Sequence, residues 1–73
     1  MENSESSIIL KKGSFAKIDG ENCLLTEEIL FPLCKEKINE LLDFKSIFSS
    51  GEILIETLNM YIKIDIENII FIQ

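Results

Sequence analysis

The run Ile69-Ile70-Phe71-Ile72 near the end of the chain is apolar at every position. Successive side chains of a strand point to opposite faces of its sheet, so such a strand needs cover on both faces. Burying an apolar side chain is worth about 1.5–3 kcal/mol, so four such residues matter as much as the whole stability of a small domain. We therefore expect this strand at the centre of a sheet. Because the chain supplies cover for only one face, we expect a partner chain to cover the other face or to extend the sheet.

The size of the chain limits it to one small domain. Its 73 residues are 47% hydrophobic and 27% charged, which is a globular composition. A domain this small has marginal stability unless something reinforces it. Residues 1–7 are polar and are predicted to form a disordered tail. The folded domain is expected over residues 8–73.

The first half of the chain predicts a hairpin followed by a helix. The pair Asp19-Gly20 separates two short apolar runs, and glycine accepts the positive φ of a tight turn, so we expect a hairpin of residues 14–18 and 22–25. Residues 8–12 fit either a short strand or one turn of helix. Apolar residues then recur at helical spacing, which predicts one amphipathic helix over residues 32–44 with a proline in its first turn.

The second half predicts three strands. Alternation indicates strands over residues 53–58 and 61–67, and the apolar run 69–72 forms the last one. The predicted order is therefore β-β-α-β-β-β, a single α+β domain.

Composition excludes most catalytic chemistry. The chain has no histidine, which excludes a His-based catalytic triad, an imidazole general base and a His-containing metal site. The acidic residues are expected on solvated faces, and the serines have no base to activate them. We expect no catalytic residue, no cofactor and no metal, and hence no enzyme. Cys23 and Cys34 are too few for a zinc site and are predicted to be reduced and buried in a cytosolic protein.

The charge also limits the partners. The net charge of −6, with lysine but no arginine, argues against nucleic acid and against an anionic membrane surface. No apolar run approaches the roughly 18 residues of a membrane span, so we expect no direct membrane insertion.

Two segments resemble the roadblock/longin family. Residues 12–22 look like the opening hairpin of the smallest roadblock proteins, and residues 53–73 are similar to their closing meander with its Ile-rich final strand. The resemblance implies one antiparallel five-stranded sheet in the order 2-1-5-4-3, with the final strand central. The truncated form is similar to the small subunits of the Ragulator and EGO complexes, which pair with one another and hold Rag GTPases at the lysosomal or vacuolar surface.

The resemblance implies a function and a location. We expect a non-enzymatic scaffold subunit that heterodimerises as an obligate member of a Ragulator/EGO-type complex and serves target-of-rapamycin nutrient signalling. Its expected partners are roadblock-type subunits and Rag GTPases, and its expected place is the cytoplasmic side of the vacuole or lysosome, held there by those partners. The alternative is a small acidic bacterial or phage regulator, such as an antitoxin, immunity protein or inhibitor, that binds a basic protein. A third possibility is a small accessory subunit of an enzyme.

The resemblance also places the interface. In the roadblock order the strand of residues 52–58 lies at a sheet edge, and an unpaired edge is a template for another chain. Roadblock dimers join these edges while their long helices pack alongside. The partner interface carried onto this chain comprises Ile38, Leu41, Leu42, Ile53, Ile55 and Thr57.

Overall fold

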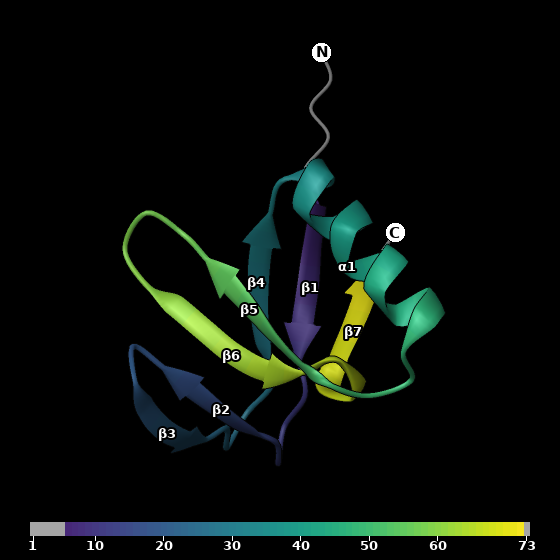
Figure 1. The fold of residues 1–73 in the computed structure, drawn as a ribbon. Coiled ribbons are helices and arrows are strands. Elements are labelled where there is room, and N and C mark those ends of the chain that lie inside the picture. The colour runs from purple at the N-terminus through teal and green to yellow at the C-terminus, as the bar shows by residue number, and fades with distance from the viewer. Residues whose placement is uncertain (1–5, 73) are drawn as a thin grey trace.

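The computed structural model describes residues 6–72, which form a small α+β domain of seven strands, one α-helix and one 3-10 helix (Figure 1). In chain order the elements are β1 (Ser6–Leu10), β2 (Phe15–Ile18), β3 (Glu21–Leu24), β4 (Ile29–Leu33), α1 (Lys35–Ile47), β5 (Glu52–Glu56), β6 (Tyr61–Asp65), η1 (Ile66–Asn68) and β7 (Ile69–Ile72).

The strands form two antiparallel sheets, which corrects the prediction of a single five-stranded sheet. One sheet has the order β4-β1-β7, and the other has the order β3-β2-β6-β5. The roadblock order 2-1-5-4-3 is therefore absent from the described part of the chain. Strand β1 lies at the centre of the first sheet and β7 lies at its edge, so the prediction of a central final strand is wrong.

The β2–β3 hairpin confirms the turn prediction. Asp19 and Gly20 have φ values of 50° and 89°, which place both in the left-handed region that a two-residue hairpin turn requires. The register then pairs Phe15 with Leu24 and Ile18 with Glu21. The sequence reading of this hairpin is correct to within one residue at the strand ends.

Strand β1 resolves the ambiguity of residues 8–12. Ile8 and Leu10 are buried and Ile9 is half-buried, and the backbone is extended. The strand begins at Ser6, so the last two residues of the expected tail belong to a sheet. The other residues of that tail, 1–5, lie outside the described residues.

Strand β4 was not predicted, and it displaces the helix. Pro32 lies in β4, which is an edge strand, and edge strands tolerate proline because its missing N–H can face away from the sheet. The helix therefore begins at Lys35 and ends at Ile47 instead of spanning residues 32–44. Its amphipathic pattern is confirmed, because Ile38 and Leu41 are buried.

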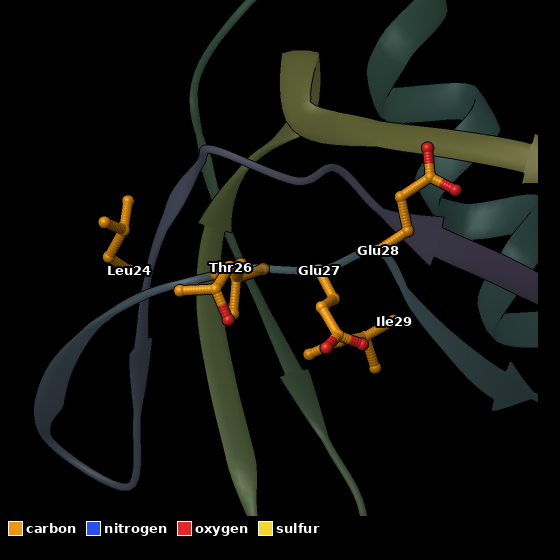
Figure 2. A pocket seen from close by; sticks show the side chains of 6 residues that line it. Leu24, Thr26, Glu27, Glu28 and Ile29 are labelled. Carbon is orange, nitrogen blue, oxygen red and sulfur yellow. The ribbon is translucent and has the colours of Figure 1, made fainter.

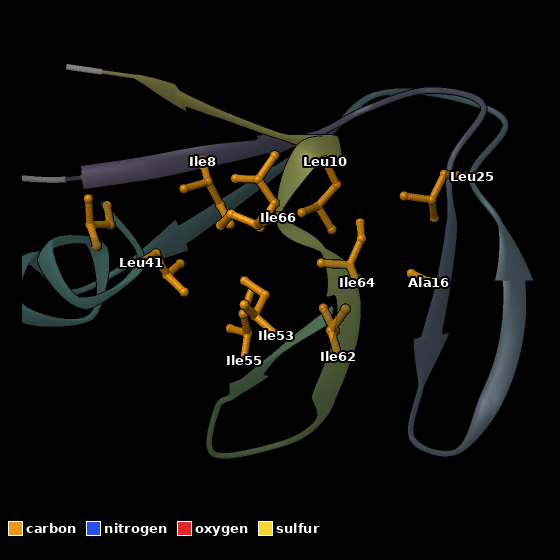
Figure 3. Packing of buried hydrophobic residues seen from close by; sticks show 12 residues of the cluster. Ile8, Leu10, Ala16, Leu25, Leu41, Ile53, Ile55, Ile62, Ile64 and Ile66 are labelled. Atoms are coloured by element: carbon orange, nitrogen blue, oxygen red, sulfur yellow. The ribbon is translucent and has the colours of Figure 1, made fainter. Parts of the chain in front are cut away.

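The core lies between the inner faces of the two sheets (Figure 3). Alternation in β5 and β6 sends four isoleucines inward, where Ile53 pairs with Ile64 and Ile55 with Ile62. The helix packs beside β1 and β7 (Figure 1), and the Nζ of Lys45 lies 5.4 Å from the ring centroid of Phe71. The buried apolar residues are Ile8, Leu10, Ala16, Leu25, Ile38, Leu41, Ile53, Ile55, Ile62, Ile64, Ile66 and Ile69.

Candidate interaction surface

The side of the β4-β1-β7 sheet that faces away from the core carries a compact apolar surface. In β1 the buried residues alternate with Ser7 and Ile9, which point to the other side. The register places Ile9 opposite both Leu30 and Ile70, so three apolar side chains form a row across the sheet. A second row lies beside it, in which Ser7 is opposite both Pro32 and Ile72. We call this surface the outer sheet face and define it as Ser7, Ile9, Leu30, Pro32, Ile70 and Ile72.

The outer sheet face remains open to solvent with residues 6–72 in place. Leu30, Ile70 and Ile72 are 62%, 39% and 41% exposed. Pro32 is exposed as well, and Ser7 and Ile9 are half-buried. None of the six residues is ionisable. The prediction that the final strand has one face without cover is confirmed for the described residues, and this uncovered area extends over all three strands.

The outer side of the other sheet is different. Phe15 lies opposite Leu24, and both are exposed, but charged residues interrupt the rest of this side. Lys63 lies between Lys17 and Leu54 in the register, and Glu52 and Glu56 flank Leu54 along β5. A face that alternates apolar and charged groups is typical of an ordinary solvated sheet. We therefore take the outer sheet face as the candidate site.

A shallow hollow lies where β3 leads into β4 (Figure 2). It has a volume of about 330 Å³, and Glu27 and Glu28 line it with carboxylates that point in different directions. Its lining residues are Leu24, Leu25, Thr26, Glu27, Glu28 and Ile29. No base or thiol lines it to assist these acids. Among residues 6–72, no group of three or more His, Cys, Asp or Glu side chains is placed to hold a metal ion.

The predicted interface residues are mostly in the core of the chain. Ile38, Leu41, Ile53 and Ile55 are buried, so their side chains cannot meet a partner without unfolding the domain. This corrects their assignment. For Ile53 and Ile55 the cause is that the inward face of β5 points into the core that β5 shares with the β4-β1-β7 sheet. Strand β5 does lie at a sheet edge, as predicted.

The other two predicted interface residues remain accessible to different degrees. Leu42 is half-buried and packs against the core cluster. Thr57 is exposed, and its hydroxyl donates to the carbonyl of Met60 at 3.1 Å and accepts from the N–H of Met60 at 3.2 Å. Thr57 therefore stabilises the turn between β5 and β6. Sequence reasoning missed Leu30, because the strand that carries it was not predicted.

The cysteines differ from the prediction that both are buried. Cys34 is exposed at the N-cap of α1, and its side chain makes no capping hydrogen bond. Cys23 is half-buried, with its Sγ 3.6 Å from the carbonyl oxygen of Glu21. Both are free thiols, and they lie on different elements.

Comparisons with known proteins do not assign the chain to a class or to a particular relative. No protein-family model, curated protein or solved structure matches it significantly. The helix α1 has neither the length nor the apolar character of a membrane span, and residues 6–72 contain no other candidate.

Proposed function

We propose that the chain is a non-enzymatic, protein-binding subunit that docks on its partner through the outer sheet face. The observation that supports this most is the exposure of Leu30, Ile70 and Ile72 on the same face of the sheet, on either side of Ile9, on a surface without charge. Contiguous exposed apolar patches on small proteins mark interaction sites more often than isolated apolar residues do. A protein partner that covers this face would remove it from water.

The proposal names no particular assembly. The expectation of a Ragulator- or EGO-type complex depended on the roadblock sheet order with the final strand at its centre. In the described residues β7 lies instead at an edge of a three-stranded sheet. What remains is the general role of a subunit in a protein assembly.

The alternative, an acidic regulator of a basic protein, predicts a different response to salt. The net charge of −6 resides outside the outer sheet face, so a charge-driven complex would use another surface. At 1 M salt the Debye length is about 3 Å, and contacts between exposed charges are screened. Apolar docking should persist or strengthen under this condition, whereas a charge-driven complex should weaken.

The experiment uses the partner that co-purifies with the tagged chain from its native host, identified by mass spectrometry and then purified alone. Calorimetry measures its association with the native chain and with Leu30→Lys and Ile70→Lys. The matched control is Leu54→Lys, because Leu54 is 42% exposed on the outer side of the other sheet. We expect the first two variants to weaken binding at least tenfold and the control to leave it nearly unchanged. Equal binding by all chains would contradict the proposal, and a loss confined to Leu54→Lys would move the interface to β5.

A further inference from the structure

Four strands lie at sheet edges in the described structure, and three of them carry a residue that discourages the addition of another strand. Strand β4 contains Pro32, β3 contains Glu21, and β5 contains Glu52 and Glu56. Charged residues and proline are the usual means by which natural sheets block their edges. Strand β7 has the sequence Ile-Ile-Phe-Ile and contains neither. It is therefore the one unprotected edge among residues 6–72.

The hydrogen bonds show which groups of β7 face this edge. The N–H of Lys11 donates to the carbonyl of Asn68 at 2.9 Å, and this pair continues the β1–β7 register one residue beyond Leu10 and Ile69. Since hydrogen-bonded and non-hydrogen-bonded pairs alternate, Ile70 and Ile72 bond to β1. The N–H of Ile69 bonds to the carbonyl of Ile66. The N–H and C=O of Phe71 therefore point outward, and they have no partner within residues 6–72.

We propose that β7 pairs antiparallel with β7 of a second copy of this chain, about a two-fold axis at Phe71. The N–H of Phe71 in each copy then donates to the C=O of Phe71 in the other. The two sheets join into one six-stranded sheet in the order β4-β1-β7-β7-β1-β4. This pairing sets Ile70 of one copy opposite Ile72 of the other, so the two outer sheet faces merge into one surface.

The composition of β7 favours a second copy at this edge. Each chain carries a net charge of −6, yet β7 and the outer sheet face contain no ionisable group. On the inner side of β7, Lys45 lies over Phe71, so the two copies meet without charge on their outer side only. A stable protein interface buries about 800 Å² on each partner, and a single exposed apolar patch rarely exceeds a few hundred. Joining two copies doubles the width of the apolar surface. The dimer would thus offer the partner of the proposed function a wider surface, but it forms without that partner.

The first test measures the mass of the purified chain by sedimentation equilibrium over a range of concentrations. The edge is altered by N-methylating Phe71, through ligation of a synthetic peptide of residues 34–73 at Cys34, which keeps every side chain. The control is N-methylation of Leu54. Because the N–H of Thr57 donates to the carbonyl of Met60, the same alternation makes the N–H of Leu54 point outward from β5.

We expect a dimer for the native and control chains, and a dissociation constant at least tenfold higher for the Phe71 derivative. A native chain that is monomeric at all concentrations would overturn the proposal, as would equal association of both derivatives. Ile9→Lys provides a further check, because Ile9 lies in the central strand away from the edge. If Ile9→Lys abolishes the dimer and N-methylation of Phe71 does not, the copies stack face to face and the edge pairing is wrong.

A second test measures the β7–β7 register directly. It remains valid even if N-methylation prevents folding. Ile70→Cys and Ile72→Cys are made separately in a chain with Cys23→Ser and Cys34→Ser. Residues opposite each other in a non-hydrogen-bonded pair are close enough for a disulfide. We expect mild oxidation to give a covalent dimer when the two chains are mixed, and at least tenfold less with either chain alone. Equal yields of covalent dimer from the mixture and from either chain alone would refute the register. Partner binding is tested separately with Leu30→Lys, and its failure would not affect this result.

Discussion

The carboxylate of Asp19 accepts a hydrogen bond from the backbone N–H of Tyr61, with a distance of 3.0 Å. In return, the N–H of Asp19 donates to the carbonyl of Tyr61 at 2.9 Å. Asp19 has a φ of 50°, which aspartate and asparagine tolerate better than most residues. One residue therefore turns the β2–β3 hairpin and also ties its tip to the start of β6.

Replacement of Asp19 tests these two roles together. Asp19→Ala removes the acceptor and leaves a residue with a β-carbon in the left-handed region, so we expect a loss of about 1–2 kcal/mol of unfolding free energy. Asp19→Asn keeps an acceptor and tolerates the φ, and it should lose much less. Thermal unfolding followed by circular dichroism measures both, since 1 kcal/mol corresponds to roughly 4–8 °C in a domain of this size. Equal melting temperatures for the two variants would refute the assigned roles.

The neighbouring residues Ile55 and Leu54 test which face of β5 points into the core. Ile55 is 0% exposed in the core, whereas Leu54 points outward. We expect Ile55→Ala to destabilise the domain by about 2–5 kcal/mol, because it leaves a cavity in a packed core. Leu54→Ala should cost well under about 1 kcal/mol. Urea unfolding gives both values, and a larger loss for Leu54→Ala would mean that β5 faces the other way.

Gly51 cannot accept a side chain without strain. Its φ is 141°, and a β-carbon there would lie 3.3 Å from Cζ of Phe44. Its carbonyl also accepts a hydrogen bond from the N–H of Ile66 at 2.8 Å, so the backbone has little freedom to adjust. We expect Gly51→Ala to cost about 1–3 kcal/mol and the adjacent Ser50→Ala to cost almost nothing. Denaturant midpoints that coincide for the two variants would contradict this.

The two thiols should react at different rates. Cys34 is exposed and Cys23 is half-buried, so a thiol reagent should modify Cys34 first in the folded protein. In denaturant both should react at similar rates. Mass spectrometry of samples taken over time identifies the modified residue. Faster modification of Cys23 in the native state would show that β3 is less protected than its position in the sheet indicates.

Local patterns predicted the elements that a few neighbouring residues specify. Asp19-Gly20 marked the hairpin, and the alternation of Ile62 and Ile64 marked β6 with its inward face. Residues 29–33 form an almost wholly apolar run with a proline, and such a run fits a strand or the approach to a helix equally well. That ambiguity hid β4 and misplaced the start of the helix.

The pairing of strands could not be read in the same way. β1 and β7 lie at opposite ends of the chain, and an apolar run alone does not specify its neighbours. Apolar residues on both faces of β7 fit a covered central strand and also an edge strand with one open face. The open face was therefore predictable, but its extension to Leu30 and Ile9 depends on contacts distant in sequence.

Pro32 limits how far strands can be added to this sheet. A sheet whose two borders both present donors and acceptors can take up chains without limit, as fibrils do. Here the nitrogen of Pro32 carries no hydrogen at the border of β4. A pair of molecules joined through β7 presents Pro32 at both of its borders, which disfavours the addition of a further strand there. Proline at this border thus favours a particle of fixed size over a filament.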